Sequence, residues 1–168
     1  VAFEFAGSSA NFRYFNALWT NNLLHSAYDS TWQRTERKTA AASRVASMVR
    51  LEMERSDGAT TAVEVPITPA ASLESIFNGP YRQTEGSEAE LRALSGYSAQ
   101  QHLCRQGFNI EGQTAYGAID SQRDARLGVY FNDQNDCSSP DSGRVVGGTS
   151  RSAKVQHGTD VWVTISAL

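Results

Sequence analysis

The sequence is organised around VASMVRLEMERSDGATTAVEVPI, residues 45–67. In both arms of this segment apolar residues alternate with polar ones, which is the period of a strand with one buried face. The polar Ser-Asp-Gly run between the arms is typical of a turn. The segment therefore predicts a β-hairpin.

The length of the hairpin loop decides which side chains of the two strands lie opposite each other. A two-residue Asp-Gly turn places Leu51 opposite Glu64, which breaks the match of apolar faces. A three-residue loop over 56–58 places Leu51 opposite Val63 instead. It also pairs Arg50 with Glu64 and gives glycine the position that needs a left-handed backbone. We therefore predict the three-residue loop.

Strand-like alternation also opens and closes the chain. Apolar residues occupy every second position over 1–5 and again over 161–165, so each end predicts a half-buried strand. Shorter apolar runs predict further strands at 108–110, 116–119, 126–131 and 144–146.

Between the first strand and the hairpin the spacing changes to that of a helix. One helix face would hold residues at spacings of three, four and four, namely Phe12, Phe15, Trp19 and Leu23. We expect this helix to run to about Tyr28. Residues 29–44 carry mixed signals, and both helix and strand stay open there.

Capping patterns predict short central helices. The Thr-Pro pair at 68–69 is typical of a helix start, and Asn-Gly-Pro at 78–80 is typical of its end. The Ser and Glu at 87 and 90 match a capping box that opens a second helix. A continuation of that helix is expected over 98–106, with Gly107 as its stop.

These patterns together predict a single α+β domain over residues 1–168. We expect a mostly antiparallel sheet with an N-terminal helix and two or three short central helices packed on it. The C-terminal half is expected to be strand-rich, because no crossover helices separate its strands. A chain of 168 residues, 40% of them hydrophobic, can bury roughly 70% of its unfolded surface in one core.

Composition excludes several classes of partner. With 15 basic and 18 acidic residues the net charge is −3, so the chain lacks the basic surface that duplex nucleic acid requires. No apolar run is long enough to predict a membrane span. A glycan or a protein remains as the expected ligand. An oligomer formed through the two terminal strands is a further expectation.

The chain start and the cysteines favour an exported protein. The chain begins at Val1 without an initiator Met, as a mature chain does after leader removal, although a trimmed tag would look the same. Cys104 and Cys137 lie 33 positions apart (137 minus 104), and a disulfide between them would stabilise the fold by about 3 to 4 kcal/mol. Two separate thiols are the alternative. We expect a secreted or extracytoplasmic location.

Residues 132–143, NDQNDCSSPDSG, are the segment richest in functional signals. Hard cations such as Ca²⁺ bind carboxylate, amide and carbonyl oxygens on flexible loops. The predicted ligands are Asp133, Asn135, Asp136 and Asp141, and Ca²⁺ is the only cofactor expected. The spacing does not match an EF-hand. The alternatives are direct contact with a ligand, or a polar loop whose side chains form local turns.

A neighbouring group of residues is the candidate ligand surface. Tyr130 and Trp162 fall on the opposite strand face from the apolar residues around them, and Asp124 and Arg126 precede the strand that carries Tyr130. Exposed aromatic rings beside an acidic loop suit a glycan or peptide. Core packing of the rings and a solvated charged turn are the alternatives.

The sequence thus favours an exported binding domain of the adhesin, lectin or extracellular-assembly type. A small secreted enzyme, a hydrolase or a toxin-like protein with a Glu or Asp acid–base group and an Arg, is one alternative. A structural subunit of a filament or hetero-oligomer is another. No catalytic residue is assigned, because none of the three histidines has zinc-site spacing and no nucleophile or phosphate-loop motif occurs.

Overall fold

The computed structural model describes residues 1–7, 9–12, 16–84, 88–90, 102–110, 125–132, 141–146 and 161–168. Its strands are β1 (Phe3–Ala6), β2 (His25–Asp29), β3 (Arg34–Lys38), β4 (Val45–Arg55), β5 (Thr60–Ser72), β6 (Arg82–Gln83), β7 (His102–Ile110), β8 (Ala125–Asn132), β9 (Asp141–Val146) and β10 (Val161–Ala167). The labelled helical elements are the 3-10 turns η1 (Ala10–Phe12), η2 (Ala17–Trp19) and η3 (Ala40–Ser43), and the α-helix α1 (Leu73–Phe77); residues 88–90 are also helical.

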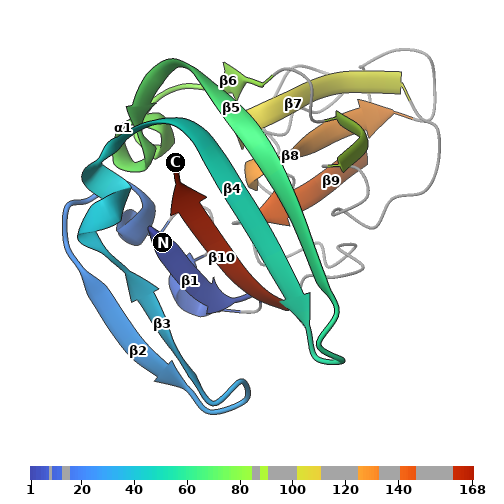
Figure 1. Cartoon of the computed structure of the whole chain (residues 1–168). Coiled ribbons are helices and arrows are strands. Elements are labelled where there is room, and N and C mark those ends of the chain that lie inside the picture. The colour runs from blue at the N-terminus through green and yellow to red at the C-terminus, as the bar shows by residue number, and fades with distance from the viewer. Residues whose placement is uncertain are drawn as a thin grey trace.

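The strands form two antiparallel sheets (Figure 1). Sheet A has the order β2-β3-β1-β10-β4-β5, and sheet B has the order β6-β7-β8-β9. The first and last strands lie side by side in the middle of sheet A, with Phe3 opposite Ile165. Because β1 also pairs with β3, and β10 with β4, both edges of each terminal strand are occupied.

The hairpin of β4 and β5 has the predicted register. Leu51 lies opposite Val63, and Arg50 lies opposite Glu64. The loop spans three residues, because Arg55 N–H donates to the carbonyl of Ala59 at 2.8 Å. Gly58 has φ +83°, the left-handed conformation that the loop requires. The three-residue loop is therefore confirmed.

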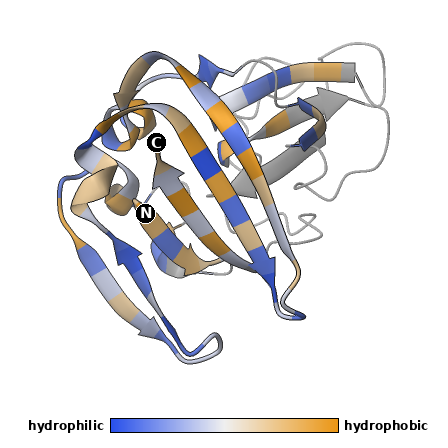
Figure 2. Ribbon diagram, viewed as in Figure 1, coloured by the Kyte–Doolittle hydropathy of each residue, from blue (hydrophilic) through white to orange (hydrophobic). Residues whose placement is uncertain are grey.

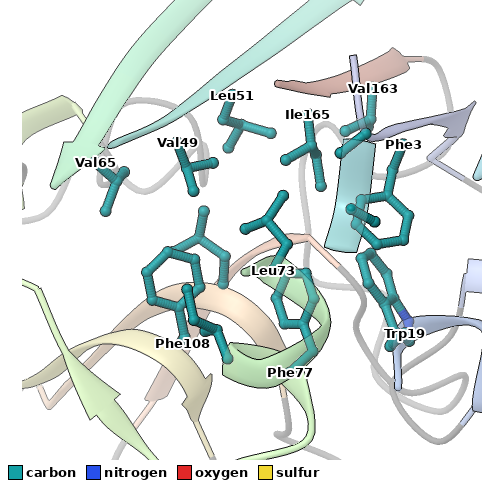
Figure 3. Packing of buried hydrophobic residues seen from close by; sticks show 14 of the residues in the cluster. Phe3, Trp19, Val49, Leu51, Val65, Leu73, Phe77, Phe108, Val163 and Ile165 are labelled. Carbon is teal, nitrogen blue, oxygen red and sulfur yellow. The ribbon is translucent and has the colours of Figure 1, made fainter. Parts of the chain in front are cut away.

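The hydrophobic core lies on the inner face of sheet A and extends to sheet B. Orange and blue positions alternate along β4 and β5, as expected for strands with one buried face (Figure 2). In the close view, α1 lies under the apolar side chains of β4 and β10 (Figure 3). The Phe77 ring of α1 lies 5.9 Å from Phe3 of sheet A and 6.0 Å from Phe108 of sheet B. This helix therefore links the two sheets through one aromatic cluster.

The α+β assignment is wrong, and the largest correction concerns the N-terminal helix. The described part of residues 10–28 contains the two 3-10 turns η1 and η2 and strand β2 instead. Phe12 and Trp19 are buried as the spacing suggested, but Leu23 is 63% exposed. Asparagine explains the difference, because Asn16 Oδ1 accepts from Leu18 N–H and Asn21 Oδ1 from Leu23 N–H. Such local bonds compete with helix formation.

The central helices are partly wrong: residues 88–90, after the predicted capping box, are helical, but the first helix starts later than predicted. Strand β5 continues to Ser72, because its last residues pair with β4 beyond a bulge between Ala46 and Met48. Helix α1 therefore begins only after Ser72, whose hydroxyl accepts from Ser75 N–H at 3.2 Å. Tertiary pairing thus overrides the Thr-Pro start signal, while the predicted end at Asn78 is confirmed.

Residues 102–106 are strand β7 and not the end of a helix. Gly107, read as a helix stop, has φ +139° inside this strand. A Cβ atom there would lie 2.1 Å from the carbonyl oxygen of Arg82 in β6. The glycine allows two backbones to approach closely, which the sequence alone did not distinguish from a helix end.

The remaining expectations divide between the described and the undescribed residues. Strands at both chain ends and at 108–110, 126–131 and 144–146 are confirmed. The open stretch 29–44 contains β3 and η3. The strand at 116–119 and most of the helix from 87 to 101 lie outside the described residues. Among the helices of the described part of the chain, none has the length and apolar composition to cross a membrane.

Candidate functional site

Most of the predicted cation ligands lie outside the described residues, namely Asp133, Asn135 and Asp136, and so does Asp124 of the predicted ligand surface. Asp141 is the first residue of β9 and lies opposite Phe131 of β8. The described ranges contain no group of three or more His, Cys, Asp or Glu side chains suited to a metal ion.

The strands that flank the acidic segment meet at one end of sheet B. Leu103 of β7 lies opposite Phe131 of β8, which lies opposite Asp141 of β9. The pairing of β7 with β8 shifts between Leu103 and Arg105, so Cys104 is the extra residue of a β-bulge. Bulges bend a strand and re-aim a side chain. This one lies next to the position where the acidic segment begins.

This geometry bears on the expected disulfide. Neighbouring strands lie about 5 Å apart, and the five residues from Asn132 to Cys137 can span up to roughly 17 Å, so Cys137 can reach Cys104. Cys104 is half-buried and is not a free thiol. Cys137 lies outside the described residues, so its pairing with Cys104 stays a prediction.

Arg126 of the predicted ligand surface has a structural environment. Its side chain is buried, and its guanidinium donates to the Phe77 carbonyl at 2.6 Å and to Asn109 Oδ1 at 2.8 Å. Asn109 in turn donates to the carbonyls of Ile76 and Gly79. Arg126 and Asn109 together donate to carbonyls at the C-terminal end of α1 and in the turn that follows it.

Trp162 lies on the outer face of sheet A but is only 4% exposed. The Arg34 guanidinium lies 5.7 Å from the Trp162 ring centroid, and Trp32 lies 6.2 Å from it. Arg34 holds Glu54 through two hydrogen bonds of 2.7 and 2.8 Å. The hydrogen bond to Glu54 raises the pKa of Arg34, and the same bond lowers the pKa of Glu54. The indole is therefore covered by its own neighbours.

The predicted ligand residues do not gather on one sheet. Trp162 belongs to β10 of sheet A, whereas Arg126 belongs to β8 of sheet B. Tyr130 is also in β8, where it pairs with Arg105 and Ser142. The structure therefore brings Arg126 and Tyr130 to one strand and separates Trp162 from them.

The fold also contains a buried polar centre around Lys38, which the sequence pattern did not predict. The Lys38 side chain has no exposed surface, and its Nζ lies 2.8 Å from Glu74 Oε1 of α1 and 3.4 Å from Asn21 Oδ1. It also donates to the backbone carbonyl of Asn21. The ring centroid of Phe3 lies 5.9 Å from the same nitrogen. An ammonium is thus held inside the aromatic core by three separate segments of the chain.

Glu74 is oriented for this contact by a second donor. Ser43 Oγ donates to its Oε2 at 2.7 Å, which leaves Oε1 for Lys38. Burial raises the pKa of Glu74, but hydrogen bonds from Lys38 and Ser43 and the positive charge of Lys38 outweigh it, so the pKa lies below its ordinary value. The lowered pKa favours the carboxylate form of Glu74.

Two other buried polar groups lie near this centre on β2 and β3. His25 pairs with Lys38 across the strands, and its Nε2 is buried without a hydrogen-bond partner. Glu36 is 4% exposed and accepts from Ala6 N–H, Ser9 and Asn11. Its carboxylate fixes the chain as it leaves β1 and turns toward η1. The sequence signal for this buried centre was the charged pair Glu36 and Lys38 at alternate positions of one strand. Charged residues at alternate positions usually indicate a strand face exposed to solvent.

Comparison with known protein families, with curated proteins and with solved structures finds no match.

Proposed function

We propose that this chain is an exported extracellular binding domain of the adhesin, lectin or extracellular-assembly type. Its binding element is the acidic segment between β8 and β9, which would hold a hard cation such as Ca²⁺ or contact a glycan or protein ligand directly. The observation that supports the proposal is the row of paired residues Leu103, Phe131 and Asp141, because β8 ends and β9 begins at this row and the segment joins these two strands.

The two ends of the acidic segment are anchored by paired strands. Loops positioned by a rigid scaffold frequently carry binding residues. The sequence supplies carboxylate and amide oxygens there, which are the ligands that hard cations prefer. The proposed Cys104–Cys137 disulfide would tie the middle of the segment to β7 and reduce the entropy lost on binding.

The topology bears on the filament alternative. Assembly through a terminal strand needs a strand with a free edge. Both β1 and β10 are flanked by strands on each side. The two terminal strands are therefore not available for pairing with a second molecule in this fold.

The proposal is tested by thermal unfolding with Ca²⁺, with Mg²⁺ and after EDTA, under non-reducing conditions. Free Ca²⁺ at 100 times its dissociation constant stabilises the folded state by about 2.7 kcal/mol, which raises Tm by about 5 to 10 °C for a chain of this size. We expect Asp133→Asn combined with Asp136→Asn to abolish this rise.

Asp57→Asn is the matched control, because Asp57 is an exposed carboxylate in the β4–β5 turn. The control variant should keep the full calcium response. A Tm that does not respond to Ca²⁺ removes the cation from the proposal. Glycan and protein binding by the same paired variants then tests direct contact, and equal binding by wild type and the double variant would refute the proposal altogether.

A further inference from the structure

Lys38, Asn21 and Glu74 together have the composition of a self-reacting cross-link. We propose that the Lys38 amine attacks the Asn21 side-chain amide and forms an isopeptide bond within the folded chain, with Glu74 as the proton-transfer group. This inference is independent of the binding proposal, because it concerns sheet A and α1.

The nucleophile is a lysine whose side chain has no exposed surface. An amine that has given up a proton is the form that attacks a carbonyl, and Glu74 Oε1, 2.8 Å from Nζ, is the acceptor for that proton. Phe3 lies over the nitrogen, and Trp19 and Phe77 pack against Phe3 at 5.2 and 5.9 Å. This aromatic surrounding keeps bulk water away from Lys38 Nζ, while Asn21 and Glu74 are half-buried at its edge.

The electrophile is the side-chain amide of Asn21. Its Oδ1 lies 3.4 Å from Lys38 Nζ, and a C=O bond is about 1.2 Å long, so Cγ lies within about 4.6 Å of the amine. Attack needs roughly 3 to 3.5 Å, which a rotation of the amide supplies. Leu23 N–H donates to Oδ1 at 3.2 Å and is placed to stabilise the negative charge that develops on this oxygen.

Asn21 is held in this position by its own segment. Its backbone N–H donates to the carbonyl of Ala17 at 2.8 Å, directly after the buried Trp19. Its carbonyl accepts from Lys38 Nζ. The backbone of Asn21 is therefore held against the amine, and only a side-chain rotation is needed to bring the amide carbon into reach, which gives an intramolecular reaction a high effective concentration.

Glu74 provides the proton transfer. Its Oε1 lies 2.8 Å from Nζ, and Ser43 fixes the other oxygen, so Ser43 is a positioning residue. Glu74 accepts a proton from the ammonium, and the free amine forms a C–N bond to Cγ. Two of the three Nζ protons pass by way of Glu74 to Nδ2, the Cγ–Nδ2 bond breaks, and ammonium leaves. Glu74 returns to a carboxylate, and no oxidant or cofactor is consumed.

The bond would change the edge of sheet A. It would join positions 17 residues apart and enclose the β2–β3 hairpin, which ends sheet A on that side. An edge hairpin is ordinarily the first part of a sheet to separate. A covalent bond from its base to the preceding segment would keep β2 and β3 attached when the protein is heated or pulled.

Mass spectrometry of the folded full-length protein tests the proposal. We expect the intact mass to be lower than the sequence mass by about 17 Da, the mass of one ammonia, in addition to any change from a disulfide. Trypsin should fail to cleave after Lys38 and should release one branched peptide that contains both Asn21 and Lys38. Asn21→Ala and Glu74→Gln should each restore the full mass.

Asn22→Ala is the matched control, because Asn22 is the exposed neighbour and its amide is absent from the Lys38 contacts. This variant should keep the mass loss and the branched peptide. Folded wild-type protein with the full sequence mass and normal cleavage after Lys38 would overturn the proposal. A 17 Da loss without the branched peptide would also overturn it, since an asparagine can lose ammonia by cyclising on its own backbone.

Discussion

Gly107→Ala is the sharpest test of how sheet B is built. Two effects act together at this position. Alanine is strained at φ +139°, which costs about 1 to 3 kcal/mol. Its Cβ atom would also lie 2.1 Å from the carbonyl oxygen of Arg82, so β6 must move away from β7.

A shift of β6 away from β7 would break three hydrogen bonds near the contact of these two strands. Thr84 N–H donates to the Gln106 carbonyl at 3.2 Å, Gln106 Nε2 donates to the Thr84 carbonyl at 2.6 Å, and Tyr81 donates to the Gln106 carbonyl at 3.0 Å. With about 1 kcal/mol for each bond, loss of the three adds about 3 kcal/mol. The expected total decrease in the free energy of unfolding is about 4 to 6 kcal/mol.

Gly58→Ala is the matched control for backbone strain. Gly58 also has a positive φ, +83°, but a Cβ atom there meets nothing within 4 Å. Only the strain remains, so the expected cost is about 1 kcal/mol. Both variants are compared with wild type by urea or guanidinium unfolding followed by circular dichroism. A Gly107→Ala cost no larger than that of Gly58→Ala would refute the close approach of β6 to β7.

Two further substitutions test the described contacts. Arg126→Met removes two buried hydrogen bonds from a charged donor and should lower the free energy of unfolding by at least about 2 kcal/mol. Unchanged stability together with lost ligand binding would assign Arg126 to the ligand surface instead. The Arg34–Glu54 pair gives a pH dependence. The lowered pKa of Glu54 means that its contribution is present above the unfolded pKa and is lost as pH falls through the folded pKa. Both side chains are substantially exposed, so the contribution is below about 1 kcal/mol. Glu54→Gln should therefore flatten the acid side of the stability profile slightly, and a larger loss of stability at neutral pH than in acid is the expected signature.

The sequence by itself determined the elements whose signals are local. In the β4–β5 hairpin, the alternation of the strands and the residues of the loop both predicted a three-residue loop. Only a loop with an odd number of residues places apolar residues of the two strands opposite each other. The same alternation located β1 and β10. These predictions succeeded because the period of a strand is two, and a shift of one residue would turn every apolar side chain to the wrong face.

Tertiary structure decided the features whose causes lie far away in the chain. Phe12 and Trp19 have helical spacing, yet they reach the core from two separate 3-10 turns. Asparagine side chains accept local backbone hydrogen bonds there, and both rings pack against Phe3 of β1. Gly107 looked like a helix end until β6 was placed against it.

The Lys38 centre could not be predicted from spacing for the same reason. Its three members come from the end of η2, from β3 and from α1, and they meet only when the sheet closes over the helix. From the sequence alone, a charged residue on a strand is predicted to face solvent. Only the packed fold shows that Lys38 points inward beside Phe3, where a carboxylate and an amide are its polar neighbours.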